Sequence, residues 1–145
     1  MSEKNYNPRM HTAEHILNQT MVRLFGCARS NNSHIERKKS KCDYNLSAMP
    51  TPEELLEVER AVNEQIDLHL PVTEEMVERS RVENFLDLSK LPENAPSILR
   101  VIRVGNYDAC ACIGPHVENT SEIGRFRIIS TDYNEGVLRI RFKLE

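Results

Sequence analysis

Two pairs of residues in this chain have the types and the spacing that bind a transition metal. His11 and His15 are four residues apart, and on a helix such residues share one face, with Cβ atoms roughly 5–6 Å apart. Cys112 and His116 form the second pair, and the stretch between them contains Gly114, so it can turn back on one ion. Thiolate and imidazole together favour zinc over magnesium or calcium. The sequence therefore predicts a Zn²⁺ site whose ligands are His11, His15, Cys112 and His116.

The sequence leaves two questions about these ligands open: which cysteine binds the ion, and whether the site is structural or catalytic. Cys110 faces the same side of a strand as Cys112, so either thiol is a candidate, and the spacing from His116 across the turn favours Cys112. Four protein ligands normally close a tetrahedron and mark a structural zinc site, whereas a catalytic ion keeps one position open. A catalytic role therefore requires either one loosely held ligand or a coordination shell that expands when substrate enters.

The hydrophobic pattern predicts the elements that must position these pairs. Residues 8–25 have apolar side chains at three- and four-residue spacing, which predicts a helix that carries the histidine pair. Pro8 suits the first turn of this helix and Gly26 its C-terminal stop. The polar stretch that follows contains two short strand-like pieces, at residues 33–36 and 41–46.

A second helix is predicted in the middle of the chain. Thr51 is a good N-cap, Pro52 suits the first helical position, and Glu54 completes a capping box. An apolar stripe at helical spacing follows, and Pro71 ends it. A third, shorter helix is expected after Thr73.

The C-terminal third has the pattern of strands. Residues 98–104 and 107–112 are two candidate strands, and residues 125–130 and 137–144 resemble a hairpin around a turn at 134–136. Helices first and an antiparallel sheet later predict an α+β fold, in which the sheet packs against the helices.

Composition restricts the class of protein. The chain has 145 residues, which suits one domain with one core. It has no apolar run of roughly 18 residues and no apolar stretch at the N-terminus, so we expect neither a membrane span nor a secretory signal, and a cytoplasmic location. The formal net charge of −3 argues against strong non-specific binding to nucleic acid, which depends on Lys and Arg.

Several segments, taken in order, resemble a known family over nearly the whole chain. Residues 11–15 match its HxxxH helix, residues 112–117 stand where it has CGGTHV, and residues 119–124 match NTGEIG. Residues 32–36 and 41–44 look like its GS…D…RFDF region. The chain thus resembles the editing domain of alanyl-tRNA synthetase and its free-standing relatives of the AlaX type in their short form. The editing domain of threonyl-tRNA synthetase is more distantly similar.

The resemblance implies a trans-editing hydrolase that removes a wrong amino acid from the acceptor end of a mischarged tRNA. Serine on tRNA(Ala) is the leading substrate, Zn²⁺ the implied cofactor, and no nucleotide cofactor is implied. Such an activity answers a physical limit, because a synthetase pocket rejects a rival with an added hydroxyl by only about 100-fold. We therefore expect residues 1–145 to form a single zinc-binding tRNA-editing domain.

The resemblance also implies a substrate pocket beside the metal, formed by Ser33, Gly114 and Pro115. Ser33 matches a small hydroxyl residue of the family's pocket and can hydrogen-bond a seryl hydroxyl, although an ordinary loop serine fits the position equally well. The chain departs from the family next to the ligands, where Pro115 replaces a threonine and Ile113 a glycine. Pro115 removes a hydroxyl and a backbone donor, so these departures bear on which amino acid is removed.

Two groups of basic side chains are candidates for contact with tRNA phosphates. Arg139, Arg141 and Lys143 alternate with apolar residues and share the polar face of the last predicted strand. The second group consists of Lys38, Lys39 and Lys41. A solvated charged face is the commoner origin of such groups, so the two explanations stand side by side.

Two other functions fit parts of the sequence. Residues 11–15 also read H-x-x-E-H, the signature of inverzincin metallopeptidases, in which Glu14 would be the general base. Alternatively, zinc only stabilises a non-catalytic module that binds tRNA or a synthetase, which a closed set of four ligands and Pro115 favour. Substitution of Glu14 by Gln tests the first alternative, and metal removal tests the second.

Overall fold

The computed structural model describes residues 7–82 and 97–145, and the statements below concern these ranges. Most of the N-terminal stretch from which the sequence predicts no secretory signal lies outside them. Within the described ranges, no helix is long and apolar enough to cross a membrane.

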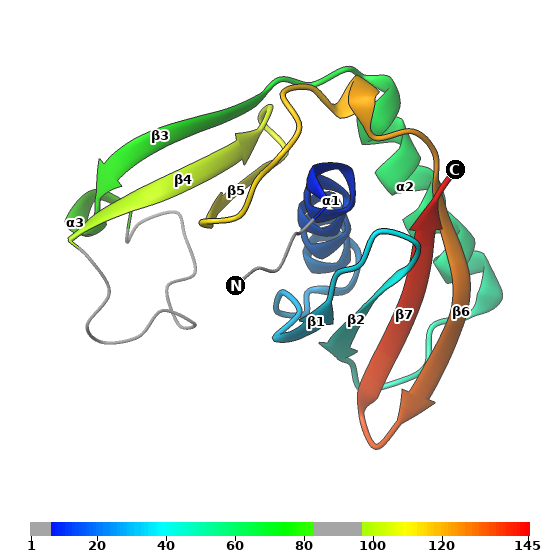
Figure 1. Ribbon diagram of the computed structural model, residues 1–145. Coiled ribbons are helices and arrows are strands. Elements are labelled where there is room, and N and C mark those ends of the chain that lie inside the picture. Colours follow the sequence, from blue (N-terminus) through cyan, green and yellow to red (C-terminus); the bar gives the residue numbers. More distant parts are fainter. Residues whose placement is uncertain (1–6, 83–96) are drawn as a thin grey trace.

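Helices and two antiparallel sheets make up the described part of the chain, so the predicted α+β class is confirmed (Figure 1). In chain order the elements are α1 (Pro8–Phe25), β1 (Asn32–His34), β2 (Ser40–Asn45), α2 (Pro52–Asp67), β3 (Val72–Glu78), α3 (Arg79–Val82), β4 (Ile98–Val104), β5 (Asp108–Ala111), η1 (Thr120–Glu122), β6 (Phe126–Asn134) and β7 (Val137–Leu144). One sheet has the strand order β1-β2-β7-β6 and the other β3-β4-β5.

Helix α1 lies between the two sheets and is buried on most of its surface (Figure 1). Its ends are those predicted: the Asn7 side chain accepts a hydrogen bond from the Met10 amide, and Gly26 ends the helix with a left-handed φ of 68°. Because α1 is covered on both sides, polar residues on it are buried as well and need partners. Asn18, for example, accepts a hydrogen bond of 2.6 Å from the Tyr44 hydroxyl.

Helix α2 packs on α1 and on β6, which is an edge strand of the four-stranded sheet. Thr51 and Glu54 form the predicted capping box. The Glu54 amide donates to the Thr51 hydroxyl at 3.1 Å, and the Thr51 amide donates to the Glu54 carboxylate at 2.8 Å. Its stripe of Val58, Val62 and Ile66 is buried in the main core.

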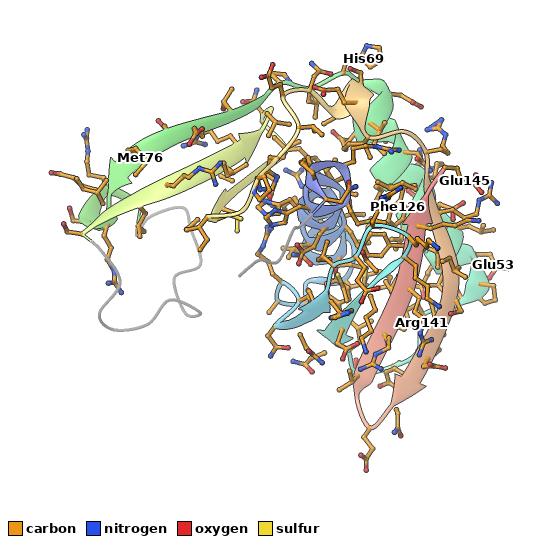
Figure 2. The ribbon with its side chains drawn as sticks, in the orientation of Figure 1. Glu53, His69, Met76, Phe126, Arg141 and Glu145 are labelled. Carbon is orange, nitrogen blue, oxygen red and sulfur yellow. The ribbon has the colours of Figure 1, made fainter. Side chains whose placement is uncertain are left out.

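The last two strands form the predicted hairpin, and β6 is longer than the sequence suggested. Glu135 and Gly136 join them with positive φ values of 51° and 82°, as a two-residue turn between twisted strands requires. The apolar face of β7 is buried, and Phe142 meets Phe126 of β6 with ring centroids 5.1 Å apart. Figure 2 shows Phe126 in the body of the molecule and Met76 at the far end of the other sheet.

The prediction that a short helix begins after Thr73 is wrong for residues 73–78. Residues 72–78 form strand β3, which pairs with β4 over its whole length, from Val72 opposite Val104 to Glu78 opposite Ile98. Among the residues that the structure describes up to 82, the helical ones after β3 are the four of α3. Backbone hydrogen bonds to β4 are long-range contacts, and they override the weak helical pattern of this segment.

The C-terminal half of α1 is attached to the turn between β4 and β5. The Tyr107 hydroxyl lies 2.7 Å from the Thr20 hydroxyl, Arg23 stacks 4.3 Å above the Tyr107 ring, and Gln19 donates a 2.9 Å hydrogen bond to Asp108. These contacts fix β5 beside α1. The segment after β5 therefore runs past the N-terminal half of the helix, where the predicted histidine ligands lie.

Candidate metal centre

Four donor side chains from two distant parts of the chain meet beside the N-terminal half of α1. Two come from α1 and two from the segment that follows β5, and their ligand atoms all lie within 4.8 Å of one another. The residues are His11, His15, Cys112 and His116. The structure thus brings together the four residues that the sequence predicted as ligands, in a cluster that can bind a metal ion.

The size of the cluster fits a tetrahedral ion. Zinc–ligand bonds of about 2.0–2.3 Å require ligand atoms about 3.3–3.6 Å apart. The Cys112 Sγ and His11 Nε2 atoms are already 3.3 Å apart. The His116 ring stacks on His11 at a centroid distance of 4.2 Å and meets His15 edge-on at 4.4 Å. Since the ligand atoms lie within 4.8 Å of one another, shifts of about 1 Å in their positions would bring them to the separations of a zinc site.

Hydrogen bonds set the tautomers of two histidines so that their Nε2 atoms carry lone pairs. His11 Nδ1 lies 3.0 Å from the Pro115 carbonyl oxygen, which can only accept, so Nδ1 holds the proton. The Thr12 hydroxyl donates to the Pro8 carbonyl at 3.0 Å, so it accepts the 2.9 Å bond from His116 Nδ1. In the neutral tautomer that these bonds favour, each Nε2 atom carries a lone pair, which is the form that metal binding requires.

Two buried ring nitrogens have no hydrogen-bond partner among the described residues. They are His116 Nε2 and His15 Nδ1. Buried polar atoms are rarely left without a partner unless an ion or water completes them. His116 Nε2 faces the cluster and fits a metal ligand. His15 Nδ1 faces the Asp108 carboxylate, 3.6 Å away, which leaves Nε2 of His15 for the cluster.

The electrostatics of the cluster favour a thiolate. Burial alone would raise the pKa of Cys112, but the three neighbouring histidines outweigh it and lower the pKa to about 3. Burial lowers the pKa of His15, but Asp108 and Cys112 outweigh it and raise the pKa to about 9. Burial, with the neighbouring histidine charges, lowers the pKa of His116 to about 4. A cation that binds here meets an anionic sulfur and displaces the His15 proton.

Cys110 is a different kind of thiol from Cys112. It lies outside the four-residue cluster, and its Sγ lies 3.5 Å from the Ala111 carbonyl oxygen. Burial raises the pKa of Cys110 to about 11, so it stays protonated at neutral pH. Of the two cysteines that the sequence left open, the geometry favours Cys112.

The loop between the cysteine and the last histidine is held tightly against the ligands. Arg100 of β4 donates hydrogen bonds to the Cys112 and Gly114 carbonyls at 3.0 Å and 2.8 Å, and it pairs with Glu74 at 2.7 Å. A Cβ on Gly114 would lie only 2.3 Å from Cε1 of His11. Glycine is therefore needed at this position because the His11 ring packs directly on the backbone.

The three predicted pocket residues have different surroundings. Gly114 and Pro115 both contact the His11 ring, one through its backbone and the other through its carbonyl. Ser33 lies on β1, where its hydroxyl donates to Ser30 Oγ at 3.0 Å and contacts Cys42 Sγ at 3.5 Å. Ile113 is 96% exposed, so the departure from glycine places an apolar side chain in solvent beside the ligands.

The predicted phosphate-binding row is already engaged in ion pairs. Each of its three basic residues meets an acidic side chain, as follows: Arg139 with Asp43 at 2.8 Å, Arg141 with Asp132 at 2.7 Å, and Lys143 with Glu145 at 3.6 Å. Figure 2 shows Arg141 on the four-stranded sheet. The second group, Lys38, Lys39 and Lys41, lies in the β1–β2 connection and at the start of β2.

Sequence reasoning missed three residues that contact the predicted ligands or the loop between them, namely Thr12, Arg100 and Asp108. Nothing in the type or spacing of Thr12 or Arg100 marks them. Asp108 carries a signal in principle, because residues 108, 110 and 112 alternate along a strand and share one face. An acidic residue on the same face as a ligand cysteine is a candidate partner for a metal-binding histidine.

Replacing Thr12 with Val is expected to weaken both the fold and the metal site. The Thr12 hydroxyl accepts hydrogen bonds from His116 Nδ1 and the Val117 amide, and valine leaves both donors buried without a partner. Two lost partners should lower the free energy of unfolding by about 2–4 kcal/mol. Urea unfolding and zinc titration measure the two effects.

Thr20 on the same helix provides a matched control. It is equally buried, and its hydroxyl likewise bonds the carbonyl four residues earlier, that of Ile16, at 2.8 Å. Thr20→Val should destabilise the protein but leave zinc affinity as in the parent. Equal loss of zinc affinity in both variants would mean that Thr12 acts only through overall stability.

Comparison with known proteins shows which proteins the chain is similar to. Residues 99–141, from β4 to β7, match the family described as the threonyl and alanyl tRNA synthetase second additional domain. Over 137 residues the chain is 33% identical to the alanine–tRNA ligase of Treponema denticola, an alignment that covers 93% of this chain and 23% of that protein.

Other alanine–tRNA ligases are similar to the same degree. That of Bacillus subtilis is 33% identical over 121 residues, which is 83% of this chain and 14% of that protein. That of Coxiella burnetii is 34% identical over 123 residues, or 84% of this chain and 14% of that protein. The chain thus spans less than a quarter of the relatives it matches. Over most of its length the chain is therefore similar to one part of alanine–tRNA ligases, and its residues 99–141 match the second additional domain of threonyl and alanyl tRNA synthetases.

Proposed function

We propose that this protein is a zinc-dependent aminoacyl-tRNA deacylase, which hydrolyses the ester of a mischarged tRNA with seryl-tRNA(Ala) as its main substrate. The observation that carries the proposal is the convergence of three imidazoles and one thiolate within 4.8 Å. Similarity to alanine–tRNA ligases supports a tRNA-related role. The proposal treats residues 1–145 as one domain with this site at its centre.

The donor set explains why zinc is the proposed ion. Imidazole nitrogen and thiolate sulfur suit zinc, whereas magnesium and calcium prefer oxygen. His11, His15 and His116 would bind through Nε2 and Cys112 through Sγ. Zinc bound there would supply Lewis-acid chemistry to an ester carbonyl or an attacking water.

The residues of the chain would hold the reacting group in place around this centre. Pro115 fixes the His11 ring through its carbonyl, and Gly114 allows the backbone to approach the ring. The exposed Ile113 side chain would line the entrance beside Cys112. Ser33 remains the proposed partner of a seryl hydroxyl. Hydrolysis adds water across the ester, so free amino acid leaves and the ribose hydroxyl of the tRNA is restored.

The row of Arg139, Arg141 and Lys143 remains the proposed contact with tRNA. Since each cation already has an acidic partner, a phosphate must compete with these ion pairs. We therefore expect single substitutions in this row to raise KM modestly and to leave kcat unchanged.

The test of the proposal is direct measurement of amino acid release. Zinc-loaded protein is incubated separately with seryl-, glycyl-, threonyl- and alanyl-tRNA, and each released amino acid is quantified. We expect release from seryl-tRNA to be fastest and correctly charged alanyl-tRNA to be spared. If a sample that holds one zinc per chain turns over none of the mischarged tRNAs, the deacylase proposal fails.

A structural zinc site is the second candidate, because four protein ligands fill a tetrahedron. In that case removal of zinc should unfold the protein, and the loaded protein should have no hydrolytic activity. A protein that keeps its far-ultraviolet circular dichroism spectrum without zinc, but loses deacylation, contradicts this candidate.

The peptidase alternative is tested by Glu14→Gln, since the Glu14 carboxylate lies 3.8 Å from His11 Nε2.

A further inference from the structure

A buried carboxylate lies on the opposite side of His15 from the metal cluster. Asp108, the first residue of β5, is 4% exposed, and its side chain is fully covered. Gln19 of α1 donates to its Oδ1 atom at 2.9 Å, and Arg29 donates to both of its oxygens. A buried carboxylate with this many partners is fixed in both position and orientation.

The two oxygens of Asp108 are unequally satisfied. Oδ1 receives the short bonds, 2.6 Å from Arg29 and 2.9 Å from Gln19. Oδ2 has a longer 3.3 Å bond from Arg29 and lies 3.6 Å from Nδ1 of His15. The oxygen with spare capacity to accept a hydrogen bond is therefore the one that faces the histidine.

The Nδ1 atom of His15, in turn, lacks a hydrogen-bond acceptor among the described residues. This atom is buried, and Asp108 Oδ2 is its ion-pair partner at 3.6 Å. The other two imidazoles of the cluster place Nδ1 on a carbonyl and on a hydroxyl, at 3.0 Å and 2.9 Å. His15 alone faces a charged acceptor, which raises the basicity of the ring more than a neutral acceptor does.

We propose that Asp108 is a positioning residue of the metal centre, which fixes the His15 ring with Nε2 toward the cluster and strengthens it as a ligand, while Arg29 and Gln19 hold Asp108 in place. This inference rests on the proposed metal site. It assigns a role to the contact between α1 and β5, which places a ligand and its orienting carboxylate on facing elements.

The test is zinc affinity in Asp108→Asn, measured by competition with a chromophoric chelator. Asparagine keeps the shape of the side chain but removes its charge, and we expect affinity to fall by about 10- to 100-fold. The visible absorption spectrum of the cobalt-substituted protein should also change, because it reports ligand geometry. Asp43→Asn is the matched control, since Asp43 is also held by an arginine, Arg139, at 2.8 Å and 3.0 Å, but its oxygens bond Arg139 and Asn32 where Asp108 faces His15.

A merely structural role for Asp108 predicts a different pattern. Asp108→Asn leaves the Arg29 charge without its partner, which by itself costs stability. The double variant Asp108→Asn with Arg29→Met removes both charges and should recover much of that stability. If Asp108 positions His15, zinc affinity stays low in the double variant. Recovery of both stability and affinity, or an Asp108→Asn affinity within threefold of the parent, would overturn the inference.

The experiment separates this inference from the proposed function. If the parent protein binds no zinc, the metal centre itself is absent and the deacylase proposal falls with it. If the parent binds zinc and Asp108→Asn binds it equally well, the centre stands and only the role of Asp108 is refuted.

Discussion

Replacing His15 with Ala is expected to abolish deacylation and to weaken zinc binding more than any single substitution outside the cluster. The variant removes one of four donors that lie within 4.8 Å of one another, and it leaves Asp108 facing an empty space. We expect turnover of seryl-tRNA to fall by at least about 1,000-fold, which corresponds to about 4 kcal/mol of transition-state stabilisation. Amino acid release and bound zinc per chain measure the two effects.

His69 provides the control for this substitution. It follows α2, lies outside the cluster, and has a left-handed φ of 53°; Figure 2 shows it pointing away from the body. His69→Asn keeps a residue that tolerates this conformation, so it should bind zinc and hydrolyse substrate as the parent does. Residual turnover of His15→Ala near the parent level would show that the metal takes no part in the reaction.

Replacing Gly114 with Ala is the second change with a large expected effect, although it adds a single methyl group. The new Cβ would lie 2.3 Å from Cε1 and 2.7 Å from Nδ1 of His11, far inside van der Waals contact. The ring must therefore move, and its hydrogen bond to the Pro115 carbonyl breaks. Because this bond fixes the tautomer and the orientation of a ligand, we expect zinc affinity to fall by about 10- to 100-fold.

Gly26→Ala separates this effect from the general cost of losing a glycine. Gly26 has a φ of 68° and no atom within 4 Å of an added Cβ, so alanine there costs about 1–2 kcal/mol through backbone strain alone. It should lower the free energy of unfolding and leave zinc affinity unchanged. A Gly114→Ala variant that binds zinc as tightly as the parent would mean that the His11 ring has room that the structure does not show.

The main helices and the donor residues of the cluster could be predicted from the sequence because each depends on local signals. The capping residues of α2 and the left-handed Gly26 act on their own neighbours, so they place helix ends without knowledge of the rest of the fold. The histidine pair is a helical spacing of the same kind. That these histidines bind zinc stays a prediction.

Only the tertiary structure decided which groups contact the candidate ligands and how the segment after α2 folds. Thr12 and the Pro115 carbonyl contact histidines about a hundred residues away, and Asp108 lies 3.6 Å from His15 across the contact of α1 with β5. No local pattern encodes such a meeting. Strand β3 is a strand because β4 lies beside it. Local propensity differs by a few tenths of a kcal/mol per residue, and long-range pairing and burial outweigh it.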